Sequence, residues 1–143
     1  MGWRWGGSPE SATRAGRLGV GMAIAILSGD PARFKPLVDL YRKVGTETGH
    51  ILESLKVGIT GHGYISKKQP NKPKTNFYPY YSNYWSYVNR QRGMGGTISK
   101  ADFDKMTAPD TALFVGSPQQ IIEKNSSPIR AIWASTFLWR RST

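Results

Sequence analysis

The sequence predicts an α/β protein in which parallel strands alternate with helices. The run from Val20 to Leu27 is apolar at almost every position, which is typical of a strand buried on both faces of a parallel sheet. The segment from Phe34 to Val44, which follows it, has apolar residues at the three-to-four residue spacing of a helix. Because this alternation continues along the 143 residues, we expect one domain of parallel α/β architecture.

The first predicted element is a helix from Pro9 to about Leu18. Ser8 followed by Pro9 is typical of a helix N-terminus, because serine caps the first free amides and proline needs no amide partner there. Gly19 is a typical helix end. The buried strand Val20–Leu27 follows directly.

The middle of the chain predicts a second helix and a second strand. The helix begins at Asp30-Pro31 and ends at Gly45 or Gly49. Lys56 to Ile65 is expected to form one strand, and its three glycines would let another group approach its backbone closely.

The remainder predicts three more helices and one short strand. The expected elements are an aromatic helix ending near Arg92, a small helix from Ser99 through Met106, a strand from Ala112 to Val115, and a helix ending near Lys124.

Composition excludes several classes of protein. The chain contains no cysteine, so it has no disulfide framework, thiol nucleophile, cysteine-ligated zinc or iron–sulfur cluster. No apolar run approaches the ~20 residues of a membrane span, and the first ten residues lack a signal peptide's apolar stretch. We therefore expect a cytoplasmic protein without a membrane segment or a metal site.

The net charge of +11 raises the question of nucleic-acid binding. The densest basic segment is the loop Lys67–Lys74, and the aromatic helix Phe77–Tyr87 follows it. Lysines beside aromatic residues suit a single-strand binder. The alternative, which we favour, is a solvated loop and a helix whose aromatic residues pack inward, because Tyr81, Tyr84, Trp85 and Val88 have helical spacing. A third alternative is a small α/β interaction module without a ligand.

Two segments place Gly-Ser-Pro at a predicted helix start, Gly6–Ser11 and Val115–Gln120. Ser-Pro is simply a good helix start, and we accept that interpretation for the second copy. The first copy has two glycines, two serines and free amides at a helix N-terminus, which also suits an anion or phosphate. Both interpretations of the first copy remain open.

Several stretches of the chain resemble the bacterial luciferase-like, flavin-dependent monooxygenase family. They are GGSPESATRAGRLGVGMAIAILSGDPARFKPLVDLYR, VGITGHGYI, FYPYYSNY and ALFVGSPQQIIEK, in an order that covers about Gly6 to Lys124. The resemblance implies a (β/α)₈ barrel that uses reduced FMN, or a deazaflavin in some branches. It also implies oxidation of a small organic substrate with molecular oxygen, with a flavin reductase as a partner and a homo-oligomeric assembly.

The resemblance covers the second half of that barrel, about three strands with their helices. By resemblance, Gly7, Ser8, Glu10 and Ser11 bind the cofactor, with the Ser11 hydroxyl donating to the phosphate. His62 is the candidate acid–base or substrate-contacting residue. The alternative for His62, which we favour, is a structural histidine bonded to neighbouring backbone.

The chain departs from the family at both ends. A (β/α)₈ barrel takes about 250 residues and cannot close on three strands. A neighbouring reading frame permits WVGVGG at the start and ILHQYELFGHQRF after Lys124, both family-like. We therefore expect residues 6–125 to be a barrel fragment, residues 1–5 and 126–143 to be out-of-frame sequence, and the isolated chain to be inactive.

Overall fold

A computed structural model describes residues 2–27 and 29–126, so all but the first residue of the expected out-of-frame tail lies outside the description. One parallel sheet has the order β1-β2-β3, with β1 (Trp3–Trp5), β2 (Gly21–Ala25) and β3 (Val57–Thr60). A second sheet pairs β4 (Gly63–Ile65) with β5 (Phe114–Gly116), also in parallel. The helices are α1 (Pro9–Leu18), α2 (Lys35–Glu47), α3 (Pro73–Gln91), α4 (Lys100–Met106) and α5 (Pro118–Ser126), with short 3₁₀ turns at Pro31–Phe34 and Leu52–Ser54.

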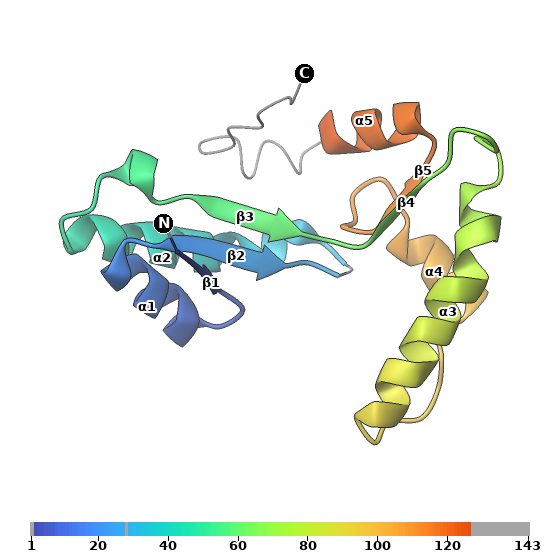
Figure 1. The fold of residues 1–143 in the computed structure, drawn as a ribbon, viewed down its shortest axis with the longest axis horizontal. Helices are drawn as coiled ribbons and strands as arrows, with labels where there is room; N and C mark the ends of the chain where they lie inside the picture. Colours follow the sequence, from blue (N-terminus) through green and yellow to red (C-terminus); the bar gives the residue numbers. More distant parts are fainter. Residues whose placement is uncertain (1, 28, 127–143) are drawn as a thin grey trace.

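Helices α1 and α2 lie on the same side of the three-stranded sheet (Figure 1). Met22 and Ile24 point from β2 toward them and are fully buried. The other face of the sheet is open among the described residues, since Ala25 and Thr60 are exposed there. Trp3 lies on this open face, and its ring covers the positions where Gly21 and Gly58 would carry a Cβ.

The pair α1–α2 is held together at a small-residue crossing. Gly16 of α1 lies so close to α2 that a Cβ there would be 2.6 Å from the carbonyl oxygen of Tyr41. Tyr41 is fully buried, and its hydroxyl donates to the carbonyl oxygen of Val20 at 2.8 Å. The same hydroxyl lies 3.3 Å from the carbonyl oxygen of Lys56. Tyr41 therefore joins α2 to the entries of β2 and β3.

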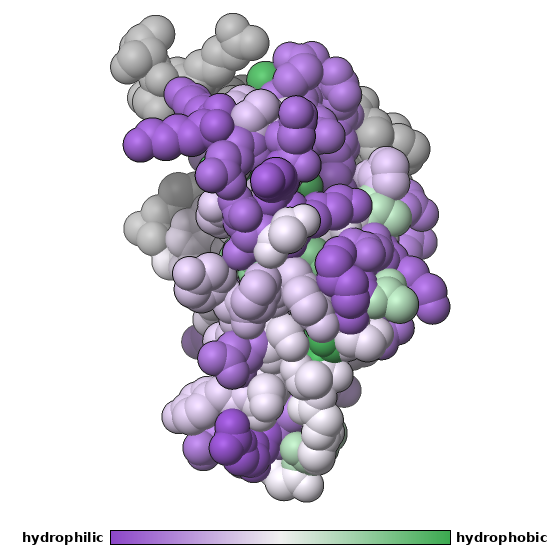
Figure 2. All heavy atoms as spheres, turned by 90° about the vertical axis from the view of Figure 1, so that its right-hand side faces the viewer, coloured by the Kyte–Doolittle hydropathy of each residue, from purple (hydrophilic) through white to green (hydrophobic). Residues whose placement is uncertain are grey.

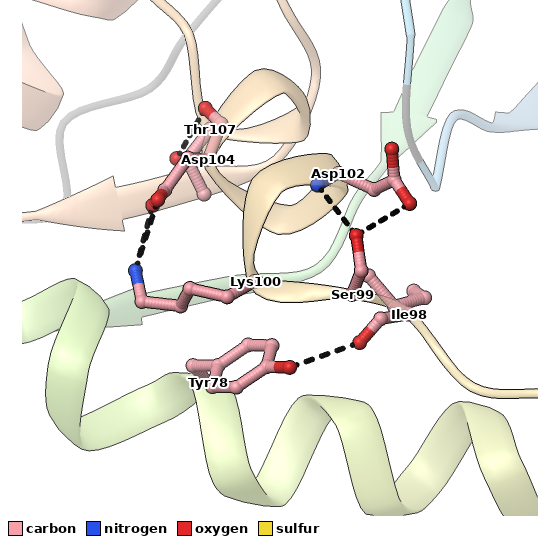
Figure 3. Close-up of polar contacts among 7 residues, drawn as sticks. All are labelled: Tyr78, Ile98, Ser99, Lys100, Asp102, Asp104 and Thr107. Carbon is pink, nitrogen blue, oxygen red and sulfur yellow. Dashed lines mark hydrogen bonds and ion pairs between the residues drawn. The ribbon is translucent and has the colours of Figure 1, made fainter.

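A second core lies under α3 and α4, at the other end of the molecule (Figure 1). Its buried members are Tyr81, Phe103, Leu113 and Val115. Figure 2 views the molecule from this side. Ser99 caps α4 by accepting a hydrogen bond from the amide of Asp102, and Tyr78 donates to the carbonyl oxygen of Ile98, which fastens α4 to α3 (Figure 3).

Helix boundaries agree with the expectations from sequence for α1, whereas the helix expected to begin at Asp30-Pro31 starts as a 3₁₀ turn, Pro31–Phe34, and α2 begins at Lys35. Helix α1 spans the predicted residues, with Ser8 as its N-cap and Gly19 in the left-handed conformation at φ 62°. Of the two expected helix ends, Gly45 lies inside α2, where a Cβ would be 2.5 Å from Cδ1 of Leu55, and the helix ends at Glu47, shortly before Gly49.

The prediction of one strand over Lys56–Ile65 is wrong. The segment forms β3 and β4, which belong to different sheets and are separated by Gly61 and His62. Gly61 lies between two backbone carbonyl groups. A Cβ at this position would be 3.2 Å from the carbonyl oxygen of Ile26 and 3.3 Å from that of Ala112. The chain therefore changes sheets where only glycine fits easily.

Two further expectations need correction. The strand expected at Ala112–Val115 is β5, which lies two residues later at its start and ends at Gly116. Tyr84, expected to pack inward with Tyr81, is 47% exposed, because its position on α3 faces away from Phe103. Strand β1 was not expected from sequence at all.

Lys124 anchors α5 onto the second core. It is 8% exposed, and its ammonium group donates to the carbonyl oxygens of Ala108 at 2.7 Å and Leu113 at 2.8 Å. It also lies 3.2 Å from the hydroxyl of Thr111. Burial, followed by the nearby charge of Lys74, lowers the pKa of Lys124 to about 8.

This burial predicts a pH dependence of stability. Between a folded-state pKa of about 8 and the ordinary value of 10.5, the unfolded chain binds a proton that the folded chain does not. Stability should therefore rise with pH across this window and be lost again as the pH falls toward 8. Between pH 7 and 9.5, we expect the free energy of unfolding of the wild type to rise by about 1–2 kcal/mol more than that of Lys124→Met.

Urea unfolding of both proteins at the two pH values measures this difference. Keeping the pH below about 10 avoids titrating the tyrosines. Equal pH dependence in the two proteins would show that Lys124 keeps its ordinary affinity for a proton.

Candidate functional site

The predicted cofactor-binding residues lie together at the N-terminus of α1, immediately after β1. Ser8 accepts a hydrogen bond from the amide of Ser11 at 3.3 Å, and the two hydroxyl oxygens are 3.2 Å apart. Gly6 is fixed to the neighbouring strand by its hydrogen bond to the carbonyl oxygen of Ala23. The local sequence thus places two hydroxyls at the carboxyl edge of the sheet, where barrel enzymes bind their ligands.

Two backbone donors remain open at this helix start. No described hydrogen bond uses the amides of Gly7 or Ser8, whereas those of Ser11 and Ala12 are taken by the side chain and carbonyl of Ser8. A Cβ on Gly7 would meet nothing within 4 Å, so its side of the loop is accessible. The site therefore offers two amides and the Ser11 hydroxyl, a donor set that fits a phosphate.

Glu10 is already engaged at the same helix start. Hydrogen bonds from its own backbone amide, and then from the Ser8 hydroxyl, hold the pKa of Glu10 below its ordinary value. Its carboxylate is fully exposed and remains ionised at neutral pH. Glu10 thus stabilises the N-terminus of α1 and would repel an anion there unless it turned away.

Arginines beside the site offset this negative charge. Two open grooves, of about 830 and 660 Å³, run along the exposed side of α1. Both are lined by Ser11 together with Arg4 from β1 and Arg14 from the next turn of α1. These two arginines were not among the predicted site residues; the signal for Arg14 was its position one helical turn after Glu10 and Ser11.

His62 lies at the same edge of the sheet, directly after β3. It is half-buried, and its Nδ1 is 3.4 Å from the hydroxyl oxygen of Tyr81. That hydroxyl in turn donates to the carbonyl oxygen of Leu27 at 3.4 Å, at the end of the β2 segment. Since a tyrosine hydroxyl has one proton and that of Tyr81 goes to Leu27, Nδ1–H of His62 donates to Tyr81 in this arrangement, and Nε2 has no partner among the described hydrogen bonds.

Two tyrosines of α3 pack against the ring of His62. Tyr81 and Tyr84 meet its ring edge-to-face, with ring centroids 5.7 and 5.6 Å away. Burial raises the pKa of Tyr81, so its hydroxyl stays protonated as a donor. His62 is therefore bonded to a side chain rather than to backbone, and Tyr81 is the supporting residue that sequence reasoning did not assign.

The residues that the structure describes contain neither a membrane-crossing helix nor a cluster of metal-ligating side chains. None of their helices has the length and apolar character that crossing a bilayer requires. Nor do residues 2–27 and 29–126 bring together three histidine, aspartate or glutamate side chains as a metal site would.

No protein-family model and no curated protein sequence matches the chain. Solved structures do match it. The monooxygenase RslO1 from Streptomyces bottropensis aligns with 90% of the chain, with a TM-score of 0.64 and 19% sequence identity. The coenzyme F420 dependent tetrahydromethanopterin reductase from Methanopyrus kandleri also aligns with 90% of it, with a TM-score of 0.57 and 15% identity.

These likenesses establish the fold. The chain spans 36% of the length of the monooxygenase and 42% of that of the reductase. The predicted fold, parallel α/β forming part of a (β/α)₈ barrel, is confirmed, and the described strands do not close that barrel. The carboxyl edge that carries Gly7–Ser11 and His62 is thus an edge of a barrel sheet.

Proposed function

We propose that the chain is part of a luciferase-like, flavin-dependent oxidoreductase, and that the N-terminus of α1 holds the phosphate of its cofactor. The supporting observation is the cluster of two open amides, at Gly7 and Ser8, beside the hydroxyl of Ser11, which lies 3.2 Å from that of Ser8. A monooxygenase is among the structures with the same partial fold. FMN is the proposed cofactor, with a deazaflavin as the alternative.

The roles of the side chains follow from their positions. Ser11 would donate its hydroxyl to a phosphate oxygen, and Arg14 would supply positive charge from the adjoining groove. His62, whose Nε2 has no partner among the described hydrogen bonds, would accept or return a proton at the substrate. The chemistry that a bound reduced flavin supplies is two-electron transfer to oxygen or to an organic substrate.

The same proposal covers the chain ends. We assign residues 6–125 to the barrel and propose that residues 1–5 and 126–143 are out-of-frame sequence. Trp3 and Trp5 are 53% and 64% exposed on the face that a closed barrel fills with packed side chains. Two indoles at this place suit a foreign segment better than a barrel strand.

Sequencing the DNA around this reading frame tests that assignment. We expect the flanks to encode the remaining barrel strands, joined to WVGVGG upstream and to ILHQYELFGHQRF downstream. Flanks without a barrel would contradict it. If the flanks do encode these strands, the complete enzyme would act in the cytoplasm on a small organic substrate and oxygen, as a homo-oligomer with a flavin reductase as its partner.

The phosphate site can be tested on the chain as it exists. We expect ribose 5-phosphate at millimolar concentration to shift the NMR amide signals of Gly7 and Ser8, and ribose to leave them unchanged. FMN should bind no more tightly than ribose 5-phosphate, because the open sheet face encloses no flavin ring. Ser11→Ala should weaken the phosphate effect by at least about tenfold, as expected for one charge-assisted hydrogen bond.

Ser117→Ala is the matched control, since Ser117 occupies the same Gly-Ser-Pro motif at the start of α5. It should leave the response at Gly7 and Ser8 unchanged. No response to ribose 5-phosphate would refute the phosphate site. Micromolar FMN binding would instead refute the expectation that the isolated chain is inactive.

A further inference from the structure

The region around α3 is basic over a long stretch of chain. Between Glu53 and Asp102 the sequence contains no acidic residue. The same stretch contains eight basic residues, namely Lys56, Lys67, Lys68, Lys72, Lys74, Arg90, Arg92 and Lys100. Such a segment repels other basic surfaces and attracts polyanions.

Helix α3 has aromatic residues on two faces, and only one of these faces packs against the second core. Phe77, Tyr81 and Trp85 pack inward against Phe103 and its neighbours. Three further tyrosines, which we call the tyrosine stripe, are Tyr80, Tyr84 and Tyr87, with exposed fractions of 76%, 47% and 60%. Their spacing of four and three residues places them along one side of the helix. The stripe is thus a partly exposed aromatic surface beside the buried face of α3.

Basic side chains lie at both ends of the tyrosine stripe. Asn76, one turn before Tyr80, lines an open groove of about 610 Å³ with Lys67 and Lys68. Arg90 follows one turn after Tyr87, in the last turn of α3. Figure 2 views the α3 end of the molecule and shows hydrophilic residues gathered at its upper end and paler residues over much of its lower part. The order along the helix is therefore cation, aromatic rings, cation.

One tyrosine of the stripe is held in position. The ring of Tyr84 meets His62 edge-to-face at an interplanar angle of 84°, and Trp85 at 74°. These contacts limit its rotamers while 47% of the side chain stays exposed. A ring ordered before binding loses less entropy when a planar ligand stacks on it.

We propose that the tyrosine stripe and its flanking cations bind single-stranded nucleic acid, a function separate from the phosphate site on α1. Exposed tyrosines offer stacking faces for bases, and Lys67, Lys68 and Arg90 offer charges for the phosphates on either side. From Asn76 to Arg90 the helix rises about 21 Å, the length of about six stacked nucleotides. Because stacking accepts every base, the binding has little sequence preference.

Fluorescence anisotropy with a labelled twelve-nucleotide oligothymidylate tests the proposal. We expect binding that weakens as salt is raised, since phosphate contacts release counterions. The triple variant Tyr80→Ala, Tyr84→Ala, Tyr87→Ala should raise the Kd at least tenfold. The matching triple change to phenylalanine should keep the wild-type Kd, because phenylalanine retains the stacking faces.

Trp3→Ser with Trp5→Ser is the control for exposed aromatic residues elsewhere, and it should leave the Kd unchanged. An abasic oligonucleotide of the same length should bind at least tenfold more weakly than oligothymidylate. Equal binding of the abasic strand, or of anionic phosphatidylserine vesicles, would overturn the proposal in favour of a simple cationic surface. Ser11→Ala should not affect this assay, so failure here and failure of the phosphate site are distinguishable.

Discussion

Replacing Tyr41 by alanine is expected to lower the free energy of unfolding by about 4 kcal/mol. The ring is fully buried between the sheet and α1, and large-to-small changes of buried aromatic residues cost about 3–5 kcal/mol. The hydroxyl donates to the carbonyl oxygen of Val20, which the variant would leave without that partner. Urea unfolding followed by circular dichroism measures the loss.

Two further variants separate the causes. Tyr41→Phe keeps the ring and removes only the hydroxyl, so we expect a loss of about 1–2 kcal/mol. Tyr87→Ala removes a tyrosine that is 60% exposed and should change stability by less than about 0.5 kcal/mol. A similar loss for Tyr87→Ala and Tyr41→Ala would contradict the packing described for α2.

Replacing Gly16 by alanine is the second change with a large expected effect, a loss of about 3 kcal/mol. A single methyl group there would lie 2.6 Å from the carbonyl oxygen of Tyr41 and 3.1 Å from the amide nitrogen of Gly45. Both atoms are backbone, so the clash is relieved only by moving α1 away from α2. Alanine favours a helix over glycine by about 1 kcal/mol, which is too little to compensate.

Thermal unfolding provides the measurement, and Gly95→Ala provides the control. Gly95 has nothing within 4 Å of a Cβ and a backbone conformation open to other residues. Its substitution should leave the midpoint unchanged. If Gly16→Ala were as stable as wild type, the close crossing of α1 and α2 would be wrong. The displaced α1 should also lose the phosphate response at Gly7 and Ser8.

Local signals in the sequence were sufficient for the helices. Ser8, Pro9 and Gly19 mark the ends of α1 because capping depends on residues within one turn. Ser99 marks the start of α4 for the same reason. The clustering of Ser8 and Ser11 at a helix start was likewise predictable, since both belong to one short motif.

Features that depend on distant residues were not predictable. The division of Lys56–Ile65 into two strands is imposed on Gly61 by the carbonyls of Ile26 and Ala112, which are far away in the sequence. The pairing of His62 with Tyr81 joins residues 19 positions apart. Spacing on α3 could not reveal that Tyr84 faces outward, because two faces of that helix carry aromatic residues.

The chain passes from one sheet to the other at Gly61 and His62, and this junction also determines how the protein unfolds. Each side of this junction has its own buried cluster, one around Met22 and Tyr41 and one around Phe103. The hydrogen bonds that join the two sides include Tyr81 to Leu27 at 3.4 Å and the backbone pair of Ala112 and Gly29 at 3.1 Å. Amide hydrogen exchange should therefore divide the molecule into two cooperative units of different stability. Moderate denaturant would then abolish binding at one end of the molecule while the other end still holds its ligand.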